Sequence, residues 1–102
     1  MSRYTIAREA KEDIKGIHRR VAKDNPPAAR RLRQTLSRTF RMLGEEPLLG
    51  ELRSDLADDL RMFCVGNYVI LYYPTHGGVA VAQVVHGARD LASLWQEGRR
   101  RG

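Results

Sequence analysis

The segment from Val79 to Leu91 ends in polar residues whose types can do chemistry. Val79 to His86 alternates and is rich in β-branched residues, which predicts a strand, and Arg89 and Asp90 follow where the chain leaves that strand. A histidine can take or give a proton near neutral pH, and an arginine can bind a phosphate through paired hydrogen bonds. The same residues also have structural uses. His86 can form a hydrogen bond at the strand end, and Arg89 with Asp90 can make an ion pair and a helix cap.

Two amphipathic helices precede this strand. Apolar residues recur at helical spacing in residues 8–23 and again in residues 27–43, where Gly44 is the expected C-cap. The two stripes are Ala10, Ile14, Ile17 and Val21, then Ala29, Leu32, Leu36, Phe40 and Leu43. The break at residues 24–27 is short and contains two prolines, so we expect the helices to form an antiparallel hairpin.

The remaining segments predict a sheet. We expect a first strand at residues 3–7, an irregular acidic stretch at 44–60, and strands at 61–65, 68–73 and 79–86. A two-residue turn at Gly66 and Asn67 joins the second strand to the third, a looser turn spans 74–78, and a short helix follows Asp90. The tyrosines at 68, 72 and 73 alternate imperfectly, so at least one should lie on the second face of the sheet. The predicted fold class is α+β: a small sandwich in which an antiparallel helical hairpin packs on one face of a mostly antiparallel sheet.

Length and composition set further limits. The 102 residues allow one domain, expected at 1–98, with an Arg-rich flexible tail at 99–102. The single cysteine, Cys64, is expected in the core, and a lone cysteine favours a reducing compartment. No apolar run approaches the ~20 residues of a membrane helix, and the N-terminus lacks the apolar core of a signal peptide. We therefore expect a cytoplasmic protein with no membrane partner. No metal-ligand spacing or nucleotide motif is present, so no cofactor is expected.

The net charge of +6 is unevenly distributed. Residues 1–41 carry a net charge of +8, residues 42–98 carry −5, and Arg99 to Arg101 add +3. Such asymmetry indicates a basic face able to meet an acidic partner or nucleic acid. The basic residues expected on the outer surfaces of the helical hairpin are Arg19, Arg20, Arg30, Arg31, Arg38 and Arg41.

Short motifs spread along the chain resemble the RelE/ParE family of toxins from bacterial type II toxin–antitoxin pairs. They are Ala10 with Asp13, Ile14 and Ile17; Asn25-Pro26 with Ala28-Ala29; Pro47 with Gly50; residues 60–63; Tyr68-Val69-Ile70 with Tyr72; and residues 84–91. The resemblance implies a toxin neutralised by a cognate antitoxin with a DNA-binding head and a tail that wraps the toxin. Such tails are often acidic, which fits the basic helical hairpin.

The resemblance leaves two activities open. RelE-like members cut messenger RNA on the ribosome, and here His86 would act as base or acid while Arg61 and Arg89 would bind the phosphate. Arg61 can instead pair with Asp58 or Asp59. ParE-like members poison DNA gyrase and are not nucleases. The RNase branch often uses lysines on its strands and a C-terminal tyrosine, but this chain has no lysine after Lys23 and no tyrosine after Tyr73.

The sequence therefore favours a ParE-like toxin that inhibits DNA gyrase. The alternatives are a RelE-like endoribonuclease acting on ribosome-bound mRNA, and a non-toxic member that acts only with its antitoxin. Gyrase inhibition works through surface complementarity and predicts no catalytic residues. The candidate contact residues are the six outer arginines named above together with Trp95, Arg99, Arg100 and Arg101.

Overall fold

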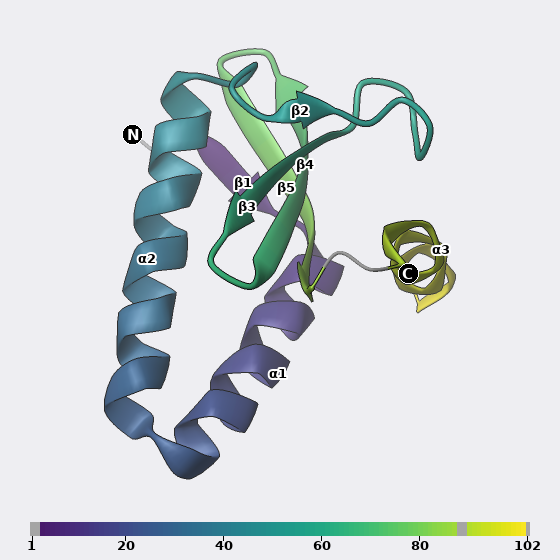
Figure 1. Ribbon diagram of the computed structural model, residues 1–102. Coiled ribbons are helices and arrows are strands. Elements are labelled where there is room, and N and C mark those ends of the chain that lie inside the picture. The colour runs from purple at the N-terminus through teal and green to yellow at the C-terminus, as the bar shows by residue number, and fades with distance from the viewer. Residues whose placement is uncertain (1–2, 88–89, 102) are drawn as a thin grey trace.

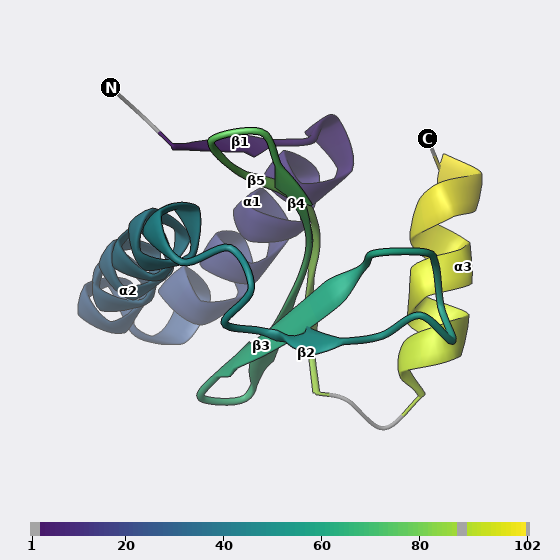
Figure 2. The ribbon, with the colours of Figure 1, turned by 90° about the horizontal axis from the view of Figure 1, so that it is seen from above.

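A five-stranded sheet separates a helical hairpin from a single C-terminal helix (Figures 1 and 2). The computed structural model describes residues 3–87 and 90–101. Its elements in chain order are β1 (Tyr4–Ile6), α1 (Arg8–Asp24), α2 (Pro26–Glu45), β2 (Glu51–Leu52), β3 (Arg61–Val65), β4 (Tyr68–Thr75), β5 (Gly78–His86) and α3 (Leu91–Arg101). The strand order is β1-β5-β4-β3-β2, with β1 parallel to β5 and the other pairs antiparallel. The predicted α+β class and the mostly antiparallel sheet are confirmed.

The hairpin of α1 and α2 turns on one residue, Asn25. Its N–H donates to the Val21 carbonyl at the end of α1, and its Oδ1 accepts from the Ala28 N–H at 3.1 Å at the start of α2. Pro26, whose missing N–H needs no partner in a first helical turn, begins α2. A single residue thus ends one helix and begins the next, which gives the antiparallel hairpin that the sequence predicted (Figure 1).

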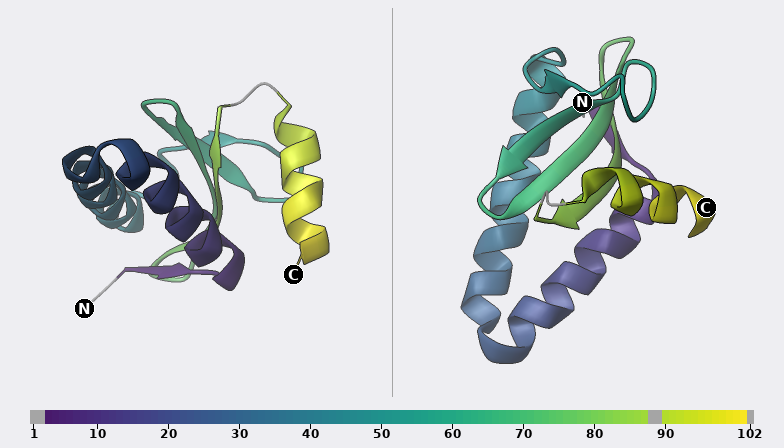
Figure 3. Two further views of the ribbon diagram at one scale, coloured as in Figure 1. Left: turned by 90° about the horizontal axis from the view of Figure 1, so that it is seen from below. Right: turned by 45° about the vertical axis from the view of Figure 1, so that its right-hand side comes forward.

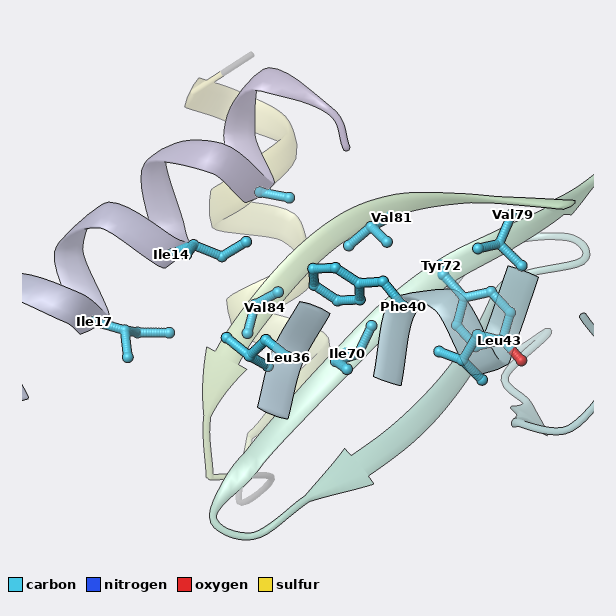
Figure 4. Packing of buried hydrophobic residues seen from close by; sticks show 11 residues of the cluster. Ile14, Ile17, Leu36, Phe40, Leu43, Ile70, Tyr72, Val79, Val81 and Val84 are labelled. Carbon is cyan, nitrogen blue, oxygen red and sulfur yellow. The ribbon is translucent and has the colours of Figure 1, made fainter. Parts of the chain in front are cut away.

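The main core fills the space between the hairpin and one face of the sheet (Figure 4). The predicted helical stripes supply it, with Ala10, Ile14 and Ile17 from α1 and Leu36, Phe40 and Leu43 from α2. These side chains pack on Ile70 and Tyr72 of β4 and on Val79, Val81 and Val84 of β5. Burial of such side chains contributes about 1.5–3 kcal/mol each, so this cluster is the main source of stability.

Helix α3 covers the face of the sheet opposite to the helical hairpin (Figure 2). Leu91 and Trp95 pack there against Leu60, Val69 and Leu71. The physical reason is that β4 is apolar on both faces, so its second face also needs a cover. Tyr73 belongs to this second cluster, as predicted for at least one tyrosine.

Helix α3 is also longer than expected. It continues through Arg99 and Arg100 to Arg101, where the sequence predicted a flexible tail. Packing explains this length, because Gly98 is buried against Gln83 of β5 and so holds the last turns of the helix to the sheet.

Three local predictions are wrong. Gly44 is not a C-cap but lies inside α2, buried where a Cβ would come within 2.7 Å of the Arg3 carbonyl oxygen. Cys64 is exposed rather than in the core, because it lies on the face of β3 opposite to Phe63 and Val65, which pack against the main core. The turn between β4 and β5 is tight rather than loose, since the strands extend to Thr75 and begin again at Gly78.

Candidate functional site

Arg61, one of the candidate phosphate-binding residues, holds a loop in place. Its Nη1 donates to the carbonyl oxygens of Gly50 at 2.8 Å and of Leu48 at 3.2 Å. No ion pair to Asp58 or Asp59, the partners considered from the sequence, forms among the described residues; Arg53 pairs with Asp55 instead, at 2.8 Å. The guanidinium is therefore engaged with backbone groups of the segment between α2 and β2.

Tyr72 fixes the same loop from the core side. Its hydroxyl accepts from the Gly50 N–H and donates to the Pro47 carbonyl, both at 2.8 Å. Burial raises the pKa of Tyr72, while the Gly50 hydrogen bond and the charge of Arg61 act to lower it. The side chain is fully buried, so the neutral hydroxyl is the form that suits this site. Together, Tyr72 and Arg61 hold four backbone groups of residues 47–50.

His86 lies at the other end of the sheet from Arg61. Both residues are in register with β4, Arg61 opposite Tyr72 and His86 opposite Tyr68, so four residues, or about 13 Å along the strands, separate them. His86 is exposed, and its ring meets Tyr68 edge-on at a centroid distance of 5.1 Å. The structure does not bring His86 together with Arg61, one of the two arginines that the nuclease interpretation assigns to the phosphate.

The segment after β5 has the predicted helix cap. Asp90 Oδ1 accepts from the Ser93 N–H at 3.4 Å, and the Asp90 carbonyl accepts from the Leu94 N–H at 3.1 Å. Arg89, the third nuclease candidate, lies outside the described residues, so its role stays a prediction. Among the described residues, no three His, Cys, Asp or Glu side chains are grouped to hold a metal ion.

Six of the eight arginines of the helical hairpin are candidate contact residues, and they lie on its exposed surface. Arg19 and Arg20 are on α1, and Arg30, Arg31, Arg38 and Arg41 are on α2; all six are exposed. None of them forms an ion pair within the described part of the chain. Their charges are therefore available to a partner, and we call this set the arginine surface.

Trp95 is not available to a partner in the same way. It is only 4% exposed and packs 6.3 Å from the Tyr73 ring in the second core. The sequence proposed it as a contact residue, and that role stays a prediction for a side chain that is buried in this structure. Arg99 lies over the Trp95 ring at 5.8 Å and is exposed, as is Arg100; the Arg101 side chain is outside the description.

One surface was missed from the sequence. Four large apolar side chains are exposed on the end of α2, the loop after it and the edge strand β2; they are Met42, Leu48, Leu49 and Leu52, with Leu48 at 67%. The hydrogen bonds from Arg61 and Tyr72 to the backbone of the loop hold Leu48 and Leu49 in this outward position. The available signal was an apolar pair between Pro47 and Gly50, too short for a strand or a helix. Exposed apolar groups of this kind are typical of protein contact surfaces.

Within residues 3–87 and 90–101, no helix is long and apolar enough to cross a bilayer.

Comparison with known proteins agrees with this architecture. A search of curated protein sequences finds no match. A solved structure described as the chromosomal ParDE toxin–antitoxin system from P. aeruginosa aligns with a TM-score of 0.71 at 14% identity, over 86% of this chain and 97% of that one. At this identity the likeness concerns the fold. The family model for the ParE toxin of the type II toxin–antitoxin system parDE matches residues 4–91. The chain therefore belongs to the ParE toxin family of type II toxin–antitoxin systems.

Proposed function

We propose that this protein is a toxin that inhibits DNA gyrase in the cytoplasm and is neutralised by a cognate antitoxin. The observation that carries the proposal is the match of residues 4–91 to the ParE toxin model. Inhibition of this kind needs a shaped surface rather than a catalytic constellation. The protein offers two such surfaces, the arginine surface and the exposed leucines beside β2.

The separation of His86 from Arg61, two of the three nuclease candidates, supports gyrase over messenger RNA as the target. Acid–base cleavage requires the base and the phosphate-binding cation to lie within hydrogen-bonding reach of one phosphodiester. His86 and Arg61 are about 13 Å apart along the strands, and Arg61 is already bonded to Gly50 and Leu48. The RelE-like alternative has no geometric support from these two residues.

The arginine surface supports the proposed antitoxin. An antitoxin with an acidic wrapping tail and a DNA-binding head would meet six exposed guanidinium groups that have no ion-pair partner in the described structure. Arginine pairs with carboxylates in a bidentate geometry, and charge complementarity speeds association.

The test is a supercoiling assay with purified gyrase, relaxed plasmid and ATP. We expect lost supercoiling and accumulated linear DNA, both reversed by the protein encoded in the reading frame next to this chain's gene. A parallel reaction follows cleavage of ribosome-bound mRNA by primer extension. Normal supercoiling with cut mRNA would move the function to the RelE-like class. Normal supercoiling with intact mRNA would indicate a member that acts only with its antitoxin.

A further inference from the structure

The exposed apolar side chains described above lie on one continuous stretch of chain, from the end of α2 through the loop to the edge strand β2. They are between 37% and 67% exposed, and we call Met42, Leu48, Leu49 and Leu52 together the leucine surface. Strand β2 is one edge of the sheet and β1 is the other. The right-hand view of Figure 3 shows this stretch at the end of the molecule opposite to the turn between α1 and α2.

The loop that carries Leu48 and Leu49 is held in place without a partner. Arg61 and Tyr72 bind four backbone groups of residues 47–50 from the side of the sheet. From the side of α2, the Glu46 carbonyl accepts the Leu49 N–H at 3.1 Å. A loop that is already ordered loses little conformational freedom on association, so it binds more tightly than a mobile one with the same contacts.

The same stretch carries the acidic excess of the chain. Residues 42–60 contain six acidic residues and one basic residue, Arg53, which gives a net charge of −5, whereas residues 61–98 contain two of each. All six acidic residues are exposed; they are Glu45, Glu46, Glu51, Asp55, Asp58 and Asp59. Arg53 pairs with Asp55, and the other five form no ion pair within the described part of the chain. The leucine surface therefore has an acidic rim.

Most of the arginine surface lies away from the leucine surface. Four of its six residues lie within two helical turns of Asn25, where α1 meets α2; they are Arg19, Arg20, Arg30 and Arg31. Arg31 is 11 residues from Met42 on α2, or about 17 Å along the helix. Arg38 and Arg41 lie nearer, so the two surfaces meet at the end of α2. A partner of one charge sign is thus attracted to one end of the molecule and repelled from the other.

The acidic rim distinguishes among the possible partners of the leucine surface. A two-fold dimer of this chain would place the same patch on both copies in contact and bring one acidic rim against the other. An antitoxin with an acidic tail would meet the same repulsion. Gyrase holds DNA, and proteins that hold DNA present basic surfaces. Of these three partners, gyrase is the one whose charge complements the rim.

We propose that the leucine surface is the contact through which this toxin binds gyrase. Leu48 and Leu49 sit against an apolar site on the target, and the acidic rim faces basic side chains around that site. An apolar centre with a polar rim is the usual construction of a protein interface. The inference rests on the proposed function, because it takes gyrase as the target, and it adds which surface meets that target.

A pair of double variants tests the apolar part of the contact. Leu48→Ser with Leu49→Ser removes the two leucines and leaves the backbone groups that hold the loop. Cys64→Ser with Ala92→Ser places serine at two exposed positions elsewhere and is the control. Circular dichroism and thermal unfolding first show that both proteins are folded. The supercoiling assay then gives the concentration for half-maximal inhibition of gyrase, and calorimetry gives the affinity for the antitoxin encoded beside this chain's gene.

We expect the leucine variant to need at least tenfold more protein for half-maximal inhibition, with antitoxin affinity within a few fold of the wild type. The control should inhibit as the wild type does. Unchanged inhibition by the leucine variant would overturn the surface proposal and leave the gyrase function intact, and a simultaneous loss of antitoxin binding would assign the surface to the antitoxin. Unchanged inhibition with loss of a wild-type dimer in sedimentation would assign it to a second copy. A wild-type protein that does not affect gyrase would overturn the proposed function and this inference together.

A second pair of variants tests the acidic rim. Glu45→Lys with Glu46→Lys reverses two charges at the C-terminal end of α2, where lysine also suits the helix dipole, so the fold should be kept. Asp24→Lys with Glu97→Lys changes the net charge equally at exposed positions elsewhere. We expect the rim variant to bind immobilised gyrase several-fold more weakly than the control at low salt, with a smaller difference at high salt. Equal affinity of the two variants for gyrase would overturn the role of the rim in the contact.

Discussion

At the scale of single residues, the Tyr72 hydroxyl holds the loop of residues 47–50, which carries the exposed Leu48 and Leu49. Removing this hydroxyl tests its role. Replacing Tyr72 with phenylalanine removes the hydroxyl and leaves the Gly50 N–H and the Pro47 carbonyl without their partner. Unpaired buried polar groups cost about 1–3 kcal/mol, so we expect Tyr72→Phe to lower the free energy of unfolding by that amount. Tyr73→Phe is the matched control, since no described residue bonds the Tyr73 hydroxyl. Chemical denaturation measures both, and equal losses would contradict this role.

The raised pKa of Tyr72 predicts a pH dependence at the same residue. In the unfolded chain, a tyrosine ionises near its ordinary pKa of 10.0, whereas burial raises the pKa of Tyr72 in the folded protein. Above that pH the unfolded chain loses its proton first, so the stability contributed by the buried neutral hydroxyl declines as the pH rises further. We expect the wild type to lose more unfolding free energy than Tyr72→Phe between neutral pH and the alkaline range. Parallel denaturation curves for the two proteins would contradict the prediction.

The residues of the helical hairpin were predictable, whereas those of the loop were not. The apolar stripes of both helices follow the helical period, and Ala10, Ile14, Leu36 and Phe40 are buried as that period requires. The bonds of Arg61 and Tyr72 to residues 47–50 depend on positions that are 11 to 25 residues apart in the chain. No local pattern contains such contacts, so the sequence placed Arg61 in a nuclease site or an ion pair instead.

At the scale of elements, α3 is held by a small and imperfect interface. Trp95 and Leu91 bury apolar surface on β4, but the buried atoms Trp95 Nε1 and Gln83 Oε1 have no hydrogen-bond partner in the described structure. Each such atom opposes docking by its desolvation cost. The sequence predicted this helix and its Asp90 cap from local signals, yet it missed the face on which the helix packs. The face on which α3 packs is set by the second apolar face of β4, and this face exists only once the strands have assembled into a sheet.

Gly98 provides a test of this docking. A Cβ at Gly98 would overlap the side-chain amide of Gln83, so Gly98→Val should force α3 away from the sheet. We expect a loss of about 1–3 kcal/mol in unfolding free energy, as for other overpacked positions. Trp95 is the one tryptophan of the chain, so its fluorescence reports docking directly and should shift to longer wavelength. Gln96→Val, on an exposed position of the same helix, is the control. An unchanged emission spectrum in Gly98→Val would contradict the proposed packing.

At the scale of the whole molecule, the charge is polarised between the hairpin and the remainder of the chain. Residues 1–41 carry +8 and residues 42–98 carry −5, so a net charge of +6 understates the field of the hairpin. The sequence could predict this polarity because the basic residues lie off the apolar stripes, and the exposure of all six arginines in the surface agrees with it. Opposite charge on a partner then acts mainly on the rate of association.

Two double variants with the same net charge test whether association depends on charge located at the arginine surface or on the total charge of the protein. Arg30→Gln with Arg31→Gln removes two charges from the arginine surface, and Ser54→Glu with Gln96→Glu changes the net charge equally at exposed positions elsewhere. We expect the arginine pair to slow association with the antitoxin several-fold more than the control pair at low salt, as measured by stopped-flow mixing. The difference should shrink at high salt, because a Debye length of about 3 Å at 1 M screens exposed charges. Equal association rates for the two variants would mean that the antitoxin responds to the total charge of the toxin. They would contradict the proposal that its acidic tail binds at the arginine surface.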